Sequence, residues 1–387
     1  MSKLKKLFGL VLTVIIVLSA FPVTVSAAVS EDGYLTYEIE NGEATITDCA
    51  TSINGTYTIP DKLGGYPVTV IGNEAFRDCI LLSNVIIPDT VTSICYRAFC
   101  ECNALSNITI PDNVVFIGEK AFYGCDALSN VKIGKSVTTI YADAFRGCIS
   151  LGQITIPDSV AQIYANAFEG CTSLAKVTFG SGLTLIYDGA FMNCTSLSSI
   201  KIPDSVTAIY KDAFNGCSAL ASVEIGSGVT LIGDRAFRSC SALTSVTIPD
   251  NVTSIGNLAF GYQNNSYTYA NFSISGYKDS AAETYAYNNG INFVSLGKSY
   301  KSIFSSNDTA DTADTADTVD TADTADVAAV VTQIDSASTD SAGLSDFGII
   351  MICLIVGMIL IAVAVVVVVV VVSSTKRKKN DDMMYYQ

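Results

Sequence analysis

A 23-residue repeat constrains the fold of this chain more than any other feature of its 387 residues. An Ala-Phe pair recurs nine times at this constant interval, with the phenylalanine at positions 76, 99, 122, 145, 168, 191, 214, 237 and 260. A period of about 20 to 50 residues is typical of solenoids, whose units bury their apolar sides only against neighbouring units. The repeat therefore predicts a stack of coils rather than separate globular domains.

The apolar positions inside each unit predict a short strand. A leucine follows the phenylalanine by six residues, from Leu82 to Leu243, and a β-branched residue follows it by nine, as in Ile108 and Val131. Another apolar residue lies two positions later, so this part of each coil alternates inward and outward as a strand does. We expect these strands to stack in parallel at about 4.8 Å, so that nine coils form a core about 45 Å long. A second apolar pair, such as Val160 and Ile163, precedes the next Ala-Phe.

From Pro111 onward, the turn after each predicted strand alternates between two residue types. A proline and a glycine occur in strict succession at Pro111, Gly134, Pro157, Gly180, Pro203, Gly226 and Pro249. Proline can close a strand because it need not donate to the hydrogen-bond ladder, and glycine permits a tighter backbone. The array therefore has a 46-residue super-period, which indicates duplication of a two-coil unit.

The full pattern, Ile-(Gly/Tyr)-x-x-Ala-Phe-x-x-Cys-x-x-Leu-x-x-Val-x-Ile-Pro, resembles the BspA-type leucine-rich repeat of microbial surface proteins, over roughly residues 65–262. The resemblance implies a right-handed leucine-rich-repeat solenoid of 23-residue coils, poor in helix, with stacked short parallel strands. It also implies an adhesion or binding role. The flanks resemble the ends of such proteins: residues 28–64, with an Asn41-Gly42 turn, predict a hairpin cap, and residues 263–298 predict a cap with a short helix and a closing strand.

The two ends of the chain predict export and membrane anchoring. Residues 1–27 combine early lysines, an apolar run and a small-residue cleavage site, as a signal peptide does. Residues 347–372 carry no charge and are long enough to span a bilayer as one transmembrane helix, and the basic cluster in residues 373–387 favours a cytoplasmic tail. A cell-wall sorting signal has a similar apolar segment, but its Leu-Pro-x-Thr-Gly motif is missing before Phe347. The localisation expected is the cell surface, with a single-pass anchor and an extracellular N-terminal part.

The charge distribution narrows the class of partner. The formal net charge is −15, and residues 299–346 contain a Thr/Ala/Asp repeat whose aspartates repel one another. We expect that segment to be an extended stalk that holds the solenoid away from the membrane. An acidic surface repels phosphate backbones, so nucleic acid is not an expected partner.

A cysteine follows the phenylalanine by three residues in eight of the repeats. The same position on stacked coils has parallel Cα–Cβ vectors about 5 Å apart, whereas a disulfide needs Cβ atoms at about 3.5 to 4.5 Å. We therefore expect a ladder of buried, unpaired thiols that pack as small apolar groups. Cys95, Cys100 and Cys102 lie close in sequence and are the best candidates for one disulfide bridge. No metal site is expected, because no set of four converging ligands is evident and the chain has no histidine.

Two further columns have alternative interpretations. Tyrosine stands at 141, 164, 187 and 210, and glycine at 72, 118, 233 and 256, so the position cannot require a positive φ. Tyr141, Tyr164, Tyr187 and Tyr210 form a candidate aromatic ladder that either grips a glycan or peptide or simply covers the turn. Aspartates follow the turn prolines, as at Asp158 and Asp204, and we expect them to accept turn hydrogen bonds rather than to share an ion.

An enzyme is not expected, and neither is a cofactor. The absence of histidine excludes Ser-His-Asp and Cys-His nucleophile pairs, and no carboxylate pair is set apart from its copies in the array. The leading hypothesis is a membrane-anchored surface protein that binds a protein or glycan of a host or neighbouring cell. Its candidate contact face consists of the outward strand residues Lys132, Thr155, Thr178, Lys201, Glu224 and Thr247. The alternative is a surface-coat or spacer protein without a specific ligand.

Overall fold

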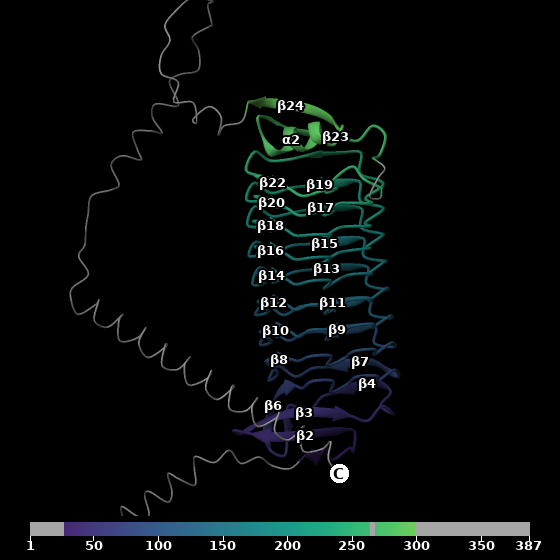
Figure 1. The fold of residues 1–387 in the computed structure, drawn as a ribbon. Helices are drawn as coiled ribbons and strands as arrows, with labels where there is room; N and C mark the ends of the chain where they lie inside the picture. The colour runs from purple at the N-terminus through teal and green to yellow at the C-terminus, as the bar shows by residue number, and fades with distance from the viewer. Residues whose placement is uncertain (1–26, 264–267, 299–387) are drawn as a thin grey trace, which may run out of the picture. The chain divides into compact units, whose positions relative to one another are not determined.

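The computed structural model of the protein describes residues 27–263 and 268–298. The predicted signal peptide, except for its last residue, and the predicted stalk, transmembrane helix and cytoplasmic tail lie outside these ranges. Within them, no helix is long and apolar enough to cross a membrane. What the structure shows is a β-solenoid that contains almost no helix (Figure 1).

The N-terminal cap is a hairpin joined to the first coils, as predicted. Strands β2 (Leu35–Glu40) and β3 (Glu43–Cys49) pair antiparallel, and Asn41 and Gly42 between them both have positive φ, of 54° and 83°. That geometry is the two-residue turn that Asn-Gly favours. The remaining cap strands are β1 (Ala28–Val29), β4 (Gly55–Thr58), β5 (Lys62–Leu63) and β6 (Tyr66–Ile71).

The longest sheet lies where the sequence shows only an apolar pair. It has 13 strands, and from β3 through β6 onward its path is parallel, one two-residue strand per coil. Its repeat strands are β8 (Ser93–Ile94), β10 (Phe116–Ile117), β12 (Thr139–Ile140), β14 (Gln162–Ile163), β16 (Leu185–Ile186), β18 (Ala208–Ile209), β20 (Leu231–Ile232) and β22 (Ser254–Ile255). Strands of two residues leave too short an alternation to be recognised in the sequence.

The strand that the sequence does predict is confirmed as a second column of parallel strands, which begin one residue earlier than expected from β9 onward and three residues earlier in β7. These strands are β7 (Leu82–Ile86), β9 (Asn107–Thr109), β11 (Asn130–Lys132), β13 (Gln153–Thr155), β15 (Lys176–Thr178), β17 (Ser199–Lys201), β19 (Ser222–Glu224) and β21 (Ser245–Thr247). They form several small sheets, because a proline coil pairs with the glycine coil after it but not with the one before it, in the part of the array that follows β9.

The 46-residue super-period has a steric cause. A Cβ at Gly134 would lie 2.1 Å from the carbonyl oxygen of Pro111, and one at Gly226 would lie 2.4 Å from that of Pro203. Each glycine turn is thus nested against the proline turn of the preceding coil, too closely for any side chain. This close contact groups the coils into pairs, each made of a proline coil and the glycine coil after it. The hydrogen bond from the N–H of Ile110 to the carbonyl of Lys132, at 2.8 Å, joins the same pair of coils.

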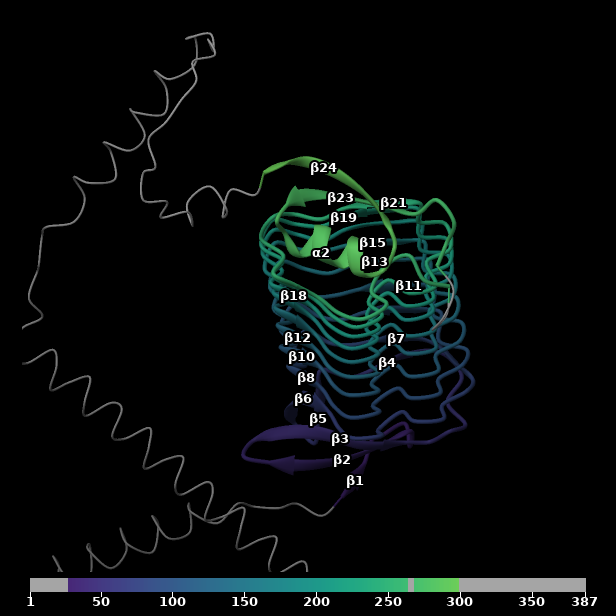
Figure 2. The ribbon, with the colours of Figure 1, turned by 45° about the horizontal axis from the view of Figure 1, so that its top comes forward.

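Figure 2 shows the coils stacked on one another, and the core inside them is a column of stacked phenylalanines. All nine are at most 1% exposed, and successive rings stack with centroids 4.8 to 5.3 Å apart. The leucines and β-branched residues of the other columns pack around them. Since no coil covers its own phenylalanine, the units depend on one another, as the repeat predicts.

The corner that carries each phenylalanine uses left-handed backbone on both sides. The residue two before it has a φ of 53° to 61° in every coil, as in Glu74, Lys120 and Leu258. The residue two after it is also left-handed from Asp78 to Ser239, and it is most often glycine. This geometry lets the N–H groups of alternate corner residues point to the next coil, as when Phe122 donates to the carbonyl of Ala144 at 2.8 Å.

The C-terminal cap contains the predicted short helix and closing strand. Helix α2 (Ala281–Asn288) begins after Ser280, whose side chain accepts the N–H of Glu283 as an N-cap. Strand β24 (Asn292–Lys298) pairs with β23 (Ser273–Lys278), a strand that the sequence analysis did not anticipate, and β23 pairs in parallel with β21. The cap therefore prolongs the second strand column past the last repeat.

Candidate functional site

The predicted contact face is a real exposed surface of the second strand column. Each strand from β11 to β21 turns one residue inward between two outward ones, and the second outward residue is the predicted one. All six predicted residues are exposed: Lys132, Thr155, Thr178, Lys201, Glu224 and Thr247. Parallel register brings them into one line, as shown by the pairs Thr155–Thr178 and Lys201–Glu224.

The charges on this face are partly satisfied within the protein. The ammonium of Lys201 forms an ion pair with the carboxylate of Glu224, its partner in the neighbouring coil. The hydrogen bond that the Lys201 ammonium donates to the Glu224 carboxylate raises the pKa of Lys201. Both side chains are largely exposed, so the pair contributes little to stability. The opposite charges of the two coils therefore give little information about a ligand, because they pair with each other.

A second line of exposed residues, missed in the sequence analysis, completes the face. It is formed by the first residue of each strand: Asn107, Asn130, Gln153, Lys176, Ser199, Ser222 and Ser245. The Nδ2 of Asn130 donates to Oδ1 of Asn107 at 2.8 Å, so amides also form a short ladder here. The sequence could have predicted these residues through the same period-two alternation, because from β11 onward each lies two positions before a predicted contact residue.

The tyrosine ladder is present as predicted. Tyr141, Tyr164, Tyr187 and Tyr210 stack in order, with ring centroids 5.3, 4.7 and 5.1 Å apart and interplanar angles of 24°, 6° and 11°. The edge of Phe116 covers the first ring. Because the ring faces lie against one another, the ladder offers mainly edges and hydroxyls to a ligand. Partial burial raises the pKa of the central Tyr187.

Glycine replaces tyrosine in this column for a reason other than φ. Neither the tyrosines nor Gly118 and Gly233 have a positive φ, which confirms that expectation. A Cβ at Gly233 would nevertheless lie 2.6 Å from backbone atoms of Tyr210 and Lys211, and one at Gly118 would lie 2.6 Å from the backbone of Cys95. The glycine coils therefore approach the preceding coil too closely for a side chain, which ends the ladder at four rings.

The turn aspartates accept hydrogen bonds, as predicted. Oδ1 of Asp158 accepts the N–H of Ser181 at 2.7 Å, and Oδ1 of Asp204 accepts that of Ser227 at the same distance. The serine hydroxyls donate to the same oxygens at 3.0 Å. These hydrogen bonds lower the pKa of both carboxyl groups, and the bond from the backbone N–H has the largest effect. Each aspartate thus stabilises the glycine turn of the following coil by accepting its hydrogen bonds.

The thiol ladder is confirmed as a column of buried, free cysteines. From Cys102 onward each Sγ donates to the carbonyl of the phenylalanine in the preceding coil, as Cys171 does to Phe145 at 3.1 Å. Burial raises the pKa of Cys171 to about 12. The candidate disulfide among Cys95, Cys100 and Cys102 is wrong, because all three are free thiols.

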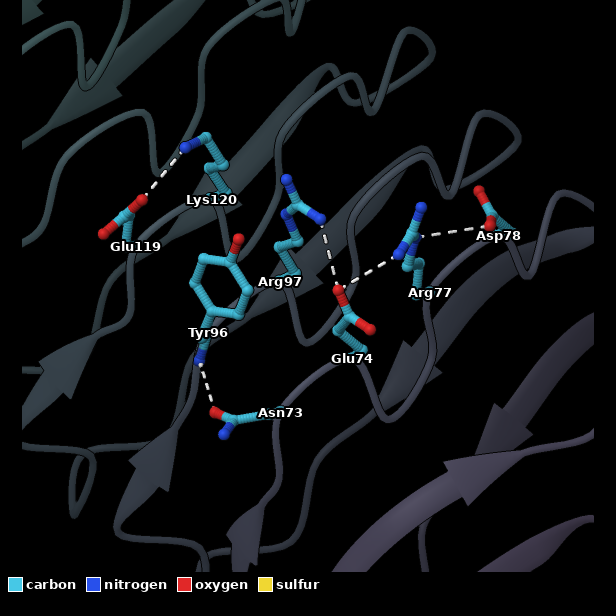
Figure 3. Close-up of polar contacts among 8 residues, drawn as sticks. All are labelled: Asn73, Glu74, Arg77, Asp78, Tyr96, Arg97, Glu119 and Lys120. Carbon is cyan, nitrogen blue, oxygen red and sulfur yellow. Dashed lines mark hydrogen bonds and ion pairs between the residues drawn. The ribbon is translucent and has the colours of Figure 1, made fainter. Parts of the chain in front are cut away.

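The phenylalanine corner carries a charged network that the sequence analysis did not single out. Figure 3 shows the Oε1 atom of Glu74 between two guanidinium groups, 3.0 Å from Arg77 and 3.2 Å from Arg97. Lys120 pairs with Glu119 at 2.9 Å, and a cavity of about 320 Å³ lies among Arg77, Arg97 and Lys120. Each of these cations already has a carboxylate partner, and the pair of Arg97 with Glu74 joins two successive coils.

The described residues contain no group of histidine, cysteine, aspartate or glutamate that could hold a metal ion. The elements that gather polar side chains are repeated surfaces rather than one convergent pocket. Such an arrangement suits binding over an extended area, which is what solenoid surfaces commonly provide.

The fold and these surfaces define a leucine-rich-repeat solenoid, a class of scaffold that is generally not enzymatic. The BspA type Leucine rich repeat region model matches residues 69–195 and 138–267, which together cover half of the chain. The protein belongs to the BspA-type leucine-rich-repeat family. No curated protein matches it.

Solved structures of bacterial repeat proteins resemble it. A leucine-rich repeat protein from Bacteroides ovatus is 29% identical with a TM-score of 0.55, over 69% of this chain and 66% of that one, just under two thirds of its length. A leucine rich cell surface protein from Faecalibacterium prausnitzii is 25% identical over 73% of this chain and 97% of that one, with a TM-score of 0.32. The T. pallidum leucine-rich repeat protein is 24% identical over 56% and 87%, with a TM-score of 0.43. The first of these supports the fold.

Proposed function

We propose that this protein is a cell-surface binding protein, anchored by one membrane span, that attaches to a protein or glycan of a host or neighbouring cell. The observation that carries the proposal is the double line of exposed polar side chains along the second strand column, at a regular coil spacing. BspA-type repeats are typically found in surface proteins, and the ends of the chain carry the sequence features of export and anchoring.

The strand face suits an extended ligand better than a small one. Its outward residues vary from coil to coil in size and polarity, from Thr155 and Thr178 to Lys132, while the inward residues stay apolar. Contacts spread over several coils would give affinity by summing weak interactions along the rod.

The experiment is a screen of glycans and extracellular-matrix proteins with residues 28–298, followed by charge variants of the face. Lys132→Glu with Lys201→Glu is expected to lower affinity for a ligand found in the screen at least tenfold. The matched control exchanges Lys201 and Glu224, as Lys201→Glu with Glu224→Lys, and so keeps the ion pair and the net charge. Full binding by the first variant would remove the strand face as the contact site.

A structural surface-coat or spacer role is the second candidate, and the Lys201–Glu224 ion pair favours it. A face whose charged side chains pair with each other has fewer charges available to bind a partner. Failure of residues 28–298 to bind any member of the screen, together with regular arrays of the protein on the cell surface by electron microscopy, would support this role.

A further inference from the structure

Among the described residues, the C-terminal cap adds strands to only one of the two strand columns of the solenoid. It prolongs the second column, since β23 pairs with β21 and β24 pairs with β23. In the described part of the chain the long sheet has no such extension, and its last strand there is β22. Figures 1 and 2 show β23 and β24 closing the end of the coils, with α2 lying between them and the side of the solenoid that carries β22.

The long sheet uses the same two backbone acceptors in each coil. The carbonyl of Thr184 accepts the N–H of Thr207, and that of Ile186 accepts the N–H of Tyr210, both at 2.9 Å. The pattern repeats up to the last coil, where Gly256 donates to Ile232 at 2.7 Å. The equivalent acceptors of the last coil are the carbonyls of Thr253 and Ile255. Within residues 27–263 and 268–298, no N–H or hydroxyl group donates to either of them.

A groove of about 990 Å³ runs beside this unpaired edge. One wall is the last coil, with Ser254, Ile255 and Gly256, and the other is α2, with Thr284 and Asn288. Its volume lies at the upper end of the range of about 300 to 1,000 Å³ that is common for ligand sites. The cap therefore leaves space next to the two carbonyls instead of covering them.

The charge of the groove indicates what kind of strand would enter it. Asp250 and Asp279 line it, and no lysine or arginine is among its lining residues. Two carbonyl acceptors on one strand edge are the groups that backbone N–H donors of an extended peptide bind when the peptide adds to a sheet, so a peptide strand fits this edge.

We propose that this groove binds an extended peptide segment with a basic side chain, which adds to the long sheet as a further parallel strand on β22. Its N–H groups donate to the carbonyls of Thr253 and Ile255, as Thr207 and Tyr210 do to the coil before theirs. The site lies at the end of the solenoid, so it is independent of the strand face and stands or fails separately from the proposed function.

The chain itself supplies a probe. A fluorescein-labelled peptide of residues 206–211, Val-Thr-Ala-Ile-Tyr-Lys, carries the two donors and a lysine. With the full-length protein in detergent, fluorescence anisotropy is expected to show saturable binding with a Kd below about 1 mM. The same peptide N-methylated at its threonine and tyrosine loses only the two N–H donors, and its affinity is expected to fall at least tenfold.

Groove variants locate the site. Thr284→Trp fills the groove from α2 and is expected to weaken peptide binding at least tenfold, while Tyr287→Trp, on the same helix but outside the groove and 86% exposed in the native chain, leaves it unchanged. Equal binding of the N-methylated peptide, unchanged binding by Thr284→Trp, or no binding at 1 mM peptide (about −4 kcal/mol) would each overturn the proposal. So would a neutral oligosaccharide that binds in the groove while the peptide does not.

Discussion

The phenolic oxygen of Tyr285 accepts the N–H of Phe260 at 3.0 Å and donates to the carbonyl of the same residue at 3.1 Å. In the preceding coils the phenylalanine N–H goes instead to an alanine carbonyl of the next coil, as when Phe237 donates to Ala259 at 2.9 Å. One side chain of α2 thus replaces the backbone that a further coil would supply. Burial raises the pKa of Tyr285 to about 12, so it keeps its proton at neutral pH.

Replacement of this tyrosine tests the cap. Tyr285→Phe keeps the ring but leaves the N–H of Phe260 buried without a partner, and an unsatisfied buried group costs about 1 to 3 kcal/mol. We expect a loss of this size in the free energy of unfolding of residues 28–298, measured by urea denaturation. The control is Tyr287→Phe on the exposed side of α2, which should change the value by less than about 0.5 kcal/mol. Equal effects of the two variants would contradict the role of the hydroxyl.

The thiol ladder predicts a pattern of chemical protection. Burial raises the pKa of Cys171 and of Cys217 to about 12, so at pH 8 almost none of either thiol is ionised, and neither is accessible. Native protein treated with iodoacetamide is expected to be alkylated first at the half-buried Cys95, and at the column cysteines only after unfolding. Mass spectrometry of peptides from the native and the unfolded protein measures both.

The same experiment tests the absence of disulfides. Without reductant, the unfolded protein should incorporate one label at each of Cys95, Cys100 and Cys102, since these are free thiols in the structure. If two of these cysteines stayed unlabelled, the peptides would lack the mass of two labels, which would show a disulfide bridge. The backbone of that coil would then have to differ from the structure.

Features that repeat in every coil could be predicted from the sequence. The phenylalanine core, the free thiols and the aspartate turns each rest on a column of identical residues, so one geometric argument applies at every coil that carries the residue. The strand of Asn130–Lys132 was also predictable, since it alternates over enough positions.

Features that arise between coils could not be predicted. The long sheet consists of two-residue strands, whose identity depends on pairing with neighbours rather than on local alternation. The Lys201–Glu224 ion pair and the nesting of Gly134 on Pro111 require the register of two coils. The groove beside β22 depends on how the cap ends, which is set by tertiary packing of α2 and not by any repeat.

The close contact between Gly233, in the tyrosine column, and the backbone of the preceding coil gives a further prediction. Gly233→Ala places a Cβ within 2.6 Å of the backbone of Tyr210 and Lys211, which must then move apart. We expect a loss of about 1 to 3 kcal/mol in unfolding free energy, as for overpacked sites. Gly152→Ala is the matched control, because nothing lies within 4 Å of its Cβ position and its φ is not positive. A neutral Gly233→Ala would mean that the coils can separate freely at this corner.

The turn aspartates predict how stability depends on pH. In the folded protein the N–H and hydroxyl of Ser181 and of Ser227 lower the pKa of Asp158 and Asp204 below the ordinary value of 3.8. A group with a lowered folded pKa stabilises the fold above its unfolded pKa, and the stabilisation is lost as pH falls through the folded value. The protein should therefore lose stability as pH falls below 3.8.

The double variant Asp158→Ala with Asp204→Ala removes this dependence at two coils. It is expected to be less stable than the native chain at pH 7, and the difference between the two should shrink as pH falls from 7 to 2, as measured by thermal unfolding. Asp126→Ala, at an exposed position away from these turns, should leave the pH profile unchanged. A constant difference across this range would show that the aspartates act through packing, because only an ionised carboxylate gains from the two serine donors on each turn.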